Sequence, residues 1–415
     1  MAFMDNMLSA AATKFGKAGC YVAPEFEKRV EGVEMPHLTL QQLFGTNVFQ
    51  LHTIMEFAGP PGSGKSSLAF YMAKMFLEQS CNAVLIETEN KLSPSLLRSI
   101  LGDDQYERLL IWEKCTQLEI WQERMTFTIS EYSKAYKKSL KEHNDAIKRR
   151  EKCTRADSKA KIVVPPVEAP LLIVLDSLGG PLSQDSAKAI QADGHASKSY
   201  PVEALKNSRY FSNLPEQIRD VPITILYTNH KMLDMNADSA YGDNERSKGG
   251  ATPAFFCSHR VFFREMGAVK QTRTNHYEQY MSFRCVKNAL NQRGNPIRLL
   301  MEWDKSVVEG DEHQVTRFGW EEALTQFLAP DKAGYKYDRE AVKQFLTVVF
   351  KTLVKYNCKE LSIQESPPRV VGTAIEADNE LRNTLSPYLG IKNWPVFNCA
   401  NPLNSKEVTA HAEPE

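Results

Sequence analysis

The most specific chemical signal in the sequence lies at residues 59–66, which read Gly-Pro-Pro-Gly-Ser-Gly-Lys-Ser and match the pattern Gly-x-x-x-x-Gly-Lys-Ser/Thr. Glycines let successive backbone N–H groups turn inward around phosphates, and Lys65 can then reach the β- and γ-phosphates of a nucleotide. The Ser66 hydroxyl can ligate Mg²⁺. We therefore predict a nucleoside triphosphate site whose contacts come from Gly59, Pro60, Pro61, Gly62, Ser63, Gly64, Lys65, Ser66 and Ser67.

Acidic residues end or follow two further apolar runs. The run at 171–176 ends in Asp176, which would hold the Mg²⁺ water shell together with Ser66, because carboxyl ends of parallel strands meet beside such a loop. The run at 83–87 leads into Glu87 and Glu89, and a carboxylate there can orient the water that attacks the nucleotide. Spacing alone leaves the choice between these two glutamates open, and both could be solvated loop residues.

A fourth apolar run, at 223–230, ends in Asn229-His230 and precedes a segment at 231–248 without apolar periodicity. A polar residue such as His230 at a strand end could sense the γ-phosphate and transmit its presence to the loop, although a structural histidine is an equal alternative. Loops of about 20 residues are unusual in compact domains unless they are functional or disordered. The residues that suit phosphate and base contacts here are Lys231, Tyr241, Arg246 and Lys248, followed by Gly249 and Gly250.

The elements that must position these residues alternate along the chain. Apolar runs at 53–57, 83–87 and 171–176 predict strands, whereas 67–79 and stretches through Leu97, Ile120 and Tyr136 predict helices. Such alternation predicts an α/β fold with a mostly parallel twisted sheet covered by helices on both faces. We expect this core to span about 36–305.

Segments outside the core differ in composition. Residues 1–35 contain apolar residues at helical spacing and predict an amphipathic arm, which packs either on its own domain or on a neighbouring subunit. A lysine-rich insertion at about 134–165 holds eleven basic and four acidic residues between 134 and 161. It predicts a solvated charged helix and a linker, or else an auxiliary surface for DNA or a partner. In the C-terminal region, 306–415, the polar tail from about 404 is expected to be disordered.

Composition limits the class of protein. The 415 residues include 51 basic and 51 acidic side chains, so nucleic-acid binding must come from local patches and not from a global field. The eight cysteines lack any Cys-x-x-Cys pair, which indicates neither a zinc site nor a disulfide framework and fits a cytoplasmic setting. No apolar stretch approaches the roughly 20 residues that span a bilayer, so we expect no membrane association.

The motifs, taken in order, make the chain resemble RecA-family recombinases, most closely the bacteriophage UvsX-type branch. The resemblance covers about 40–305 and rests on the segments at 56–66, 85–89, 173–177, 228–230, 248–250, 258–261, 264–270 and 286–288. It implies a RecA-like core that binds ATP and Mg²⁺ between subunits of a helical filament. The activity that it implies is a DNA-dependent ATPase that pairs single-stranded DNA with homologous duplex DNA and exchanges strands.

The resemblance also implies individual roles. Glu89, and not Glu87, corresponds to the glutamate that activates water, and His230 corresponds to the γ-phosphate sensor. Lys287 corresponds to a lysine that reaches the ATP of the neighbouring subunit. The segment after His230 resembles the second DNA-binding loop, and about 183–195 resembles the first, so that His195 and the nearby Lys198 are expected to contact DNA.

Further partners follow from the resemblance: single-strand-binding and mediator proteins, and a neighbouring subunit for the arm. If a phage encodes the chain, the location would be the cytoplasm of its host. One departure concerns the trans-subunit contact, because the family often has a second basic residue where this chain has Ala289, with Arg293 the nearest substitute.

Three other classes of protein could also contain this glycine-rich loop. A hexameric helicase motor usually carries a large domain before it, whereas about 58 residues precede Gly59 here. A small-molecule kinase needs an arginine-rich lid, which is not evident in the sequence. A catalytically weak RecA-like mediator or scaffold would bind nucleotide without turnover.

Overall fold

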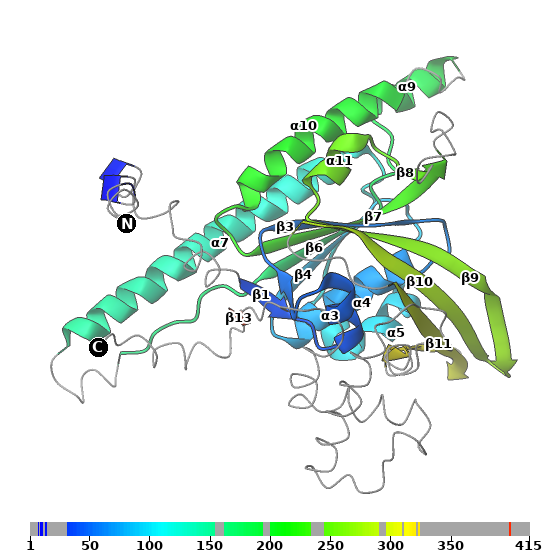
Figure 1. Ribbon diagram of the computed structural model, residues 1–415, viewed down its shortest axis with the longest axis horizontal. Helices are drawn as coiled ribbons and strands as arrows, with labels where there is room; N and C mark the ends of the chain where they lie inside the picture. Colours follow the sequence, from blue (N-terminus) through cyan, green and yellow to red (C-terminus); the bar gives the residue numbers. More distant parts are fainter. Residues whose placement is uncertain are drawn as a thin grey trace, which may run out of the picture.

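A ten-stranded sheet with helices on both faces forms the body of the protein (Figure 1). The computed structural model describes residues 7, 9–10, 13–14, 31–153, 162–193, 200–233, 245–289, 296–308, 311–320, 323 and 398–399. The strand order is β12-β11-β10-β9-β3-β7-β6-β4-β5, and β8 pairs with β7 beside this path. Within these residues, none of the helices has the length and apolar character that a membrane-spanning helix needs.

One half of the sheet is parallel. Its strands, in spatial order, are β3 (Thr53–Gly59), β7 (Ile223–Leu233), β6 (Leu171–Asp176), β4 (Asn82–Glu87) and β5 (Leu110–Trp112). Every residue of β3 is buried. Burial on both faces explains why these strands read as continuous apolar runs in the sequence.

The other half is an antiparallel meander, which joins the first half where β9 pairs in parallel with β3. Its strands are β9 (His259–Arg273), β10 (His276–Asn288), β11 (Ile297–Val308) and β12 (Asp311–Phe318). In β10, buried residues alternate with partly exposed ones from Gln279 to Cys285. This alternation is typical of a sheet that buries one face.

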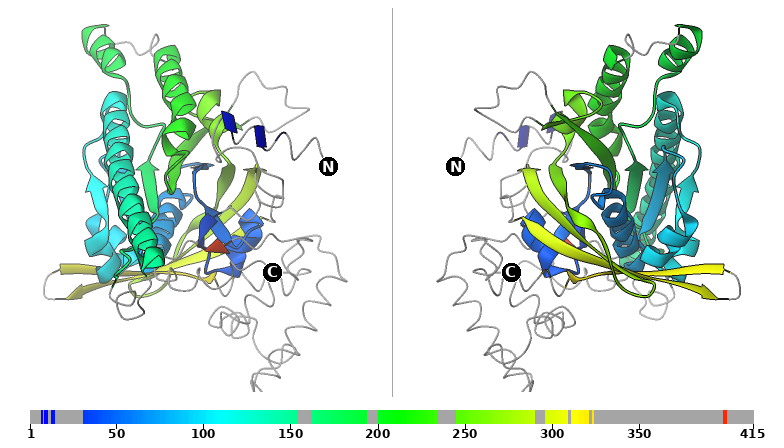
Figure 2. Two further views of the ribbon diagram at one scale, coloured as in Figure 1. Left: turned by 90° about the vertical axis from the view of Figure 1, so that its left-hand side faces the viewer. Right: turned by 90° about the vertical axis from the view of Figure 1, so that its right-hand side faces the viewer.

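Helices lie on both faces of the parallel half (Figures 1 and 2), and the buried apolar side chains form two cores. One core is covered by α3 (Leu38–Phe44), α4 (Lys65–Glu78), α5 (Pro94–Leu101) and α6 (Asp103–Arg108). The other is covered by α7 (Leu118–Lys152) and α10 (Tyr200–Ile218), and α11 (Ala251–Phe256) packs on α10. The α/β class, the mostly parallel sheet and the helices on both faces are therefore confirmed.

A second, three-stranded sheet brings distant parts of the chain together. It is built from β1 (Glu31–Glu34), β2 (Val48–Gln50) and β13 (Asn398–Cys399). The parallel pairing of β13 with β1 brings described residues of the C-terminal region beside the start of the core. Most of the predicted arm at 1–35, and the tail from about 404, lie outside the described residues.

Several predicted boundaries change. The helix after the glycine-rich loop begins at Lys65 and not at Ser67. The ends of the predicted loop at 231–248 are strands, because β7 runs on to Leu233 and pairs with β8 (Glu245–Ser247). The register pairs Lys231, Met232 and Leu233 with Ser247, Arg246 and Glu245, so the backbone ladder forms here without an alternating apolar pattern in the sequence. Residues 234–244, between them, lie outside the described part.

Other segments also gain a defined structure. The lysine-rich segment forms the second half of α7 as far as Lys152, and the described residues 162–170 before β6 belong to no helix or strand. The segment matched to a first DNA loop begins as a helix, α9 (Gln184–Asp193). The sheet continues past residue 305, the expected end of the core, through the end of β11 and all of β12.

Candidate active site

The glycine-rich loop connects the end of β3 to the start of α4, which is the position that a phosphate cradle requires. Gly62 and Gly64 have φ values of 74° and 85°, a region that glycine adopts without strain. A Cβ on Gly64 would also lie 1.8 Å from Met281 Sδ. Gly64 precedes α4 and no side chain caps the helix, so its first N–H groups can bind an anion. These features fit the phosphates of a nucleotide.

Lys65 is folded back over this loop. Its side chain is buried, and Nζ donates to the Pro60 carbonyl at 2.6 Å. Burial lowers the pKa of Lys65, while the Asp176 and Glu89 carboxylates raise it, so three charged groups share one site. An ammonium held near two carboxylates and a helix N-terminus can bind the triphosphate when it is present.

The predicted magnesium ligands lie together. Ser66 Oγ donates to Asp176 Oδ1 at 2.8 Å, close to the spacing of about 3 Å between adjacent ligands that octahedral Mg²⁺ holds at about 2.1 Å. Thr228 Oγ1 also donates to Asp176 Oδ1. Burial raises the pKa of Asp176 despite these hydrogen bonds. A desolvated carboxylate beside a hydroxyl oxygen fits a hard divalent cation.

The structure separates the two candidate glutamates. Glu87 is buried, and its Oε1 accepts the backbone N–H groups of Glu89 and Lys91 at 3.0 Å each. It therefore holds the turn after β4. Glu89 instead points into a pocket, where its Oε1 accepts from Ser177 Oγ at 2.6 Å and contacts His230 Nε2 at 2.9 Å.

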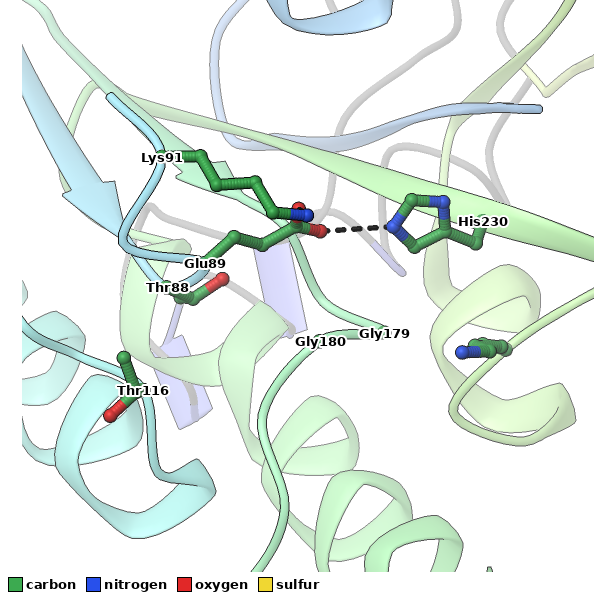
Figure 3. Close-up of a pocket in the computed structure, with 8 residues that line it drawn as sticks. Thr88, Glu89, Lys91, Thr116, Gly179, Gly180 and His230 are labelled. Atoms are coloured by element: carbon green, nitrogen blue, oxygen red, sulfur yellow. Dashed lines mark hydrogen bonds and ion pairs between the residues drawn. The ribbon is translucent and has the colours of Figure 1, made fainter. Parts of the chain in front are cut away.

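This pocket of about 360 Å³ lies past the carboxyl ends of β4 and β6, beside His230 of β7 (Figure 3). It is lined by Thr88, Glu89, Lys91, Thr116, Gly179, Gly180, His230 and Lys248. The hydrogen bond from His230 is the largest of the interactions that hold the pKa of Glu89 well below its usual range, with Ser177 and Lys91 adding to it. Glu89 is therefore ionised near neutral pH, and it can orient and polarise a water molecule.

A buried polar network links the site to the ends of the predicted DNA loop. Asn229 Nδ2 donates to Glu56 Oε1 at 3.0 Å and to the Lys248 carbonyl at 2.9 Å. Arg260 pairs with Glu56 and donates to Ser247 Oγ at 3.0 Å. Because Glu56 lies on β3, Asn229 beside His230 on β7, and Ser247 on β8, this network connects the strand before the glycine-rich loop to both ends of the predicted DNA loop.

The predicted DNA-binding residues are only partly described. Lys231 Nζ lies 3.7 Å from the centre of the Phe262 ring, and Lys248 lines the pocket. Gly249 and Gly250 have φ values of 86° and 92°. The backbone of Arg246 pairs in β8, whereas Tyr241, His195 and Lys198 lie outside the described residues.

Lys287 bonds to α11 within its own chain. Its Nζ donates to the carbonyls of Ala254 at 3.2 Å and Phe255 at 2.6 Å. The Phe255 side chain is 74% exposed beside it. A contact from Lys287 to the ATP of a neighbouring subunit remains a prediction.

Reasoning from the sequence missed Ser177, Thr228, Asn229 and Arg260 as site residues, although all four lay in motifs that carried the resemblance. Ser177 follows Asp176 directly, and Thr228 and Asn229 precede His230, so their places after buried strands were the available signal. The pairing of Arg260 with Glu56 joins residues far apart in the sequence, and nothing local indicates it.

Comparison with known proteins gives limited support. No protein-family profile matches the chain. A segment of 65 residues, 16% of the chain, is 35% identical to the DNA repair and recombination protein RadB of Methanothermobacter thermautotrophicus. The match covers 27% of RadB, so the chain matches about a quarter of the length of this relative. The chain is therefore a partial relative of a recombination protein, in line with the RecA-family resemblance of its motifs.

Proposed function

We propose that the chain is an ATP-dependent DNA recombinase of the RecA family, most similar to its UvsX-type branch, that acts in the cytoplasm. The observation that carries the proposal is the convergence of Lys65, Asp176, Glu89 and His230 at the carboxyl end of the parallel half, next to both ends of a candidate DNA loop. The segment similar to RadB supports the same class.

Different residues of the site have separate roles in ATP hydrolysis. Bound ATP would supply the phosphoanhydride bond that water cleaves. The loop N–H groups and Lys65 bind phosphates, and Ser66 and Asp176 hold Mg²⁺. Glu89 orients the attacking water, and its lowered pKa suits it to positioning more than to complete proton removal.

Coupling of hydrolysis to DNA would depend on His230 and on the buried polar network that contains Glu56, Asn229 and Arg260. His230 shares Glu89 Oε1 with Ser177, so a phosphate that draws His230 away would release an oxygen of Glu89 for water. His230 also begins the segment that leads through Lys231 into the DNA loop. DNA held by this loop would restrict where His230 lies, and turnover would then respond to DNA. Stacking of a base on Tyr241 would add about 1–3 kcal/mol.

A filament requires contacts between subunits. We propose that the arm at 1–35 docks on the next subunit and that Lys287, beside the exposed Phe255, meets the neighbouring nucleotide. Single-stranded DNA, homologous duplex DNA, and single-strand-binding and mediator proteins would be the other partners.

Negative-stain electron microscopy combined with a strand-exchange assay tests this function. With ATP and single-stranded DNA we expect helical filaments and exchange of a homologous duplex. Closed rings would favour a helicase motor, and nucleotide binding without turnover would favour a mediator. Transfer of phosphate to a small molecule without DNA would favour a kinase. Each of these outcomes contradicts the recombinase proposal.

A further inference from the structure

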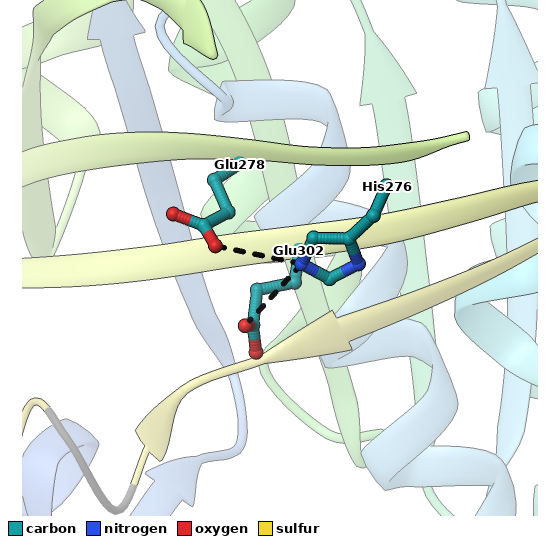
Figure 4. A group of neighbouring side chains, drawn as sticks. All are labelled: His276, Glu278 and Glu302. Atoms are coloured by element: carbon teal, nitrogen blue, oxygen red, sulfur yellow. Dashed lines mark ion pairs between the residues drawn. The ribbon is translucent and has the colours of Figure 1, made fainter. Parts of the chain in front are cut away.

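A second cluster of ligand-type side chains lies on the antiparallel meander (Figure 4). His276 and Glu278 come from β10, and Glu302 and Asp304 come from β11. The register pairs His276 with Asp304 and Glu278 with Glu302. Because residues two apart in a strand share a face, all four side chains project from the same face of the sheet.

The distances in this cluster suit a small divalent cation. His276 Nε2 lies 3.4 Å from Glu278 Oε1 and 3.9 Å from Glu302 Oε1. Two ligands at about 2.0–2.1 Å from tetrahedral Zn²⁺ lie about 3.3 Å apart. Glu278 therefore already has the required spacing from the imidazole, and Glu302 needs a shift of about half an ångström.

Asp304 prepares the histidine for metal binding. Its Oδ1 lies 2.7 Å from His276 Nδ1, which favours the tautomer with the proton on Nδ1. The Nε2 lone pair then faces two carboxylates. Metal-binding histidines usually donate their other ring N–H to a carboxylate in this way. His276 and Glu302 are 18% and 13% exposed, so the ligands are only partly solvated.

Neighbouring polar side chains contact the two carboxylates. Arg317 Nη1 lies 3.8 Å from Glu302 Oε2, whereas the contact of Glu302 with His276 is through Oε1. Thr272 Oγ1 donates to Glu278 Oε1 at 3.2 Å and can stabilise that carboxylate as a ligand. The basic residues opposite on β9, Lys270 and Arg273, are exposed.

We propose that His276, Glu278 and Glu302 form a binding site for a divalent transition metal such as Zn²⁺, with Asp304 orienting the histidine. A neutral imidazole and two carboxylates balance the charge of the ion and leave one position for water. A nitrogen ligand favours Zn²⁺ over Mg²⁺. The bound ion would link β10 to β11 next to the β9–β10 turn and stabilise the meander.

Isothermal titration of the full chain with ZnCl₂ at neutral pH, without nucleotide, tests the site. Wild-type protein should bind one more equivalent of Zn²⁺ than His276→Gln or Glu302→Gln. Asp304→Asn should keep the site but weaken it about 10- to 100-fold. Zinc bound by cysteines or by Asp176 is common to all variants, so it cancels in the difference.

Control variants distinguish loss of this site from general damage to the protein. Glu123→Gln, an exposed carboxylate on α7, should bind as wild type does. Circular dichroism checks that each variant folds, and Glu278→Gln replaces any variant that does not. Protons compete with Zn²⁺ for the His276 imidazole, so affinity should fall as the pH is lowered. Equal zinc binding by wild type and all folded variants would overturn the proposal and identify the cluster as an ion pair of protonated His276.

Discussion

The two halves of the large sheet carry their chemistry in different ways. In the parallel half, β3 is buried along its whole length, and Glu89 and Asp176 lie at or just past the carboxyl ends of β4 and β6. His230 lies on β7 opposite Gly59, the last residue of β3, and so at the same edge of this half. In the meander, β10 alternates between buried and partly exposed residues, and its ligand-type side chains lie on the strand itself. Two-sided burial confines polar function to strand ends, whereas one-sided burial leaves a strand face available.

This difference predicts that, within one chain, the strand-end residues of the parallel half have the largest effect on nucleotide chemistry. Lys65→Ala should have the largest effect, because it removes the buried ammonium at the phosphate loop. We expect loss of ATP binding and of hydrolysis, measured by fluorescent-nucleotide titration and phosphate release. Lys74→Ala, the other lysine of α4, should behave as wild type does. Equal losses in both variants would indicate general damage to the helix.

Replacement of Glu89 should separate binding from turnover. Glu89→Gln keeps the shape but removes the charge that orients water, so turnover should fall about 100-fold or more while ATP still binds. Single-turnover phosphate release measures this. The matched control is Glu113→Gln, an exposed carboxylate just after β5. Wild-type turnover by Glu89→Gln would remove Glu89 from the catalytic role.

The sequence made much of the parallel half predictable and little of the meander. Apolar runs ending in Asp176 and His230 indicated strands and site together, because two-sided burial imposes both signals. Spacing alone left the choice between Glu87 and Glu89 open, and only the family resemblance favoured Glu89; the structure adds that Glu87 Oε1 accepts two backbone N–H groups. In the meander, the buried residues Met281, Phe283 and Cys285 alternate with polar ones, a weaker signal. The His276 cluster depends on strand register, which the sequence does not state.

Removal of basic side chains should weaken DNA binding when they lie at the predicted DNA loop, but not when they lie on the meander. The triple change of Lys231, Arg246 and Lys248 to Gln should weaken single-stranded DNA binding, because each lost phosphate contact flattens the salt dependence by about 0.7. The logarithmic slope should thus fall by about two, as measured by fluorescence anisotropy across a salt series. Matched changes in the meander, at Lys270, Arg273 and Lys305, should leave it unchanged. An unaltered slope in the first variant would remove that loop from the DNA site.

The seam between the two halves, where β9 pairs with β3, should become less stable in acid. We expect this effect to be smaller than the preceding ones. His259 begins β9, next to Met55 of β3, and burial lowers its pKa to about 4. The unfolded chain, with an ordinary histidine pKa of about 6.5, binds this proton first, so stability should fall as the pH drops from about 6.5 to 4. The contribution is about 3 kcal/mol at most.

Urea unfolding at a series of pH values measures this loss. His259→Leu does not titrate and should lack this component of the pH dependence. An identical pH profile in wild type and His259→Leu would mean that the seam is not acid-sensitive.

Steady-state ATP hydrolysis with and without single-stranded DNA, in wild type and Glu89→Gln side by side, tests the central claim most directly. We predict turnover that DNA stimulates in wild type and that nearly disappears in Glu89→Gln with DNA present. Wild-type turnover that ignores DNA, or a DNA response that survives in Glu89→Gln, would contradict a DNA-coupled ATPase at the carboxyl end of the parallel half.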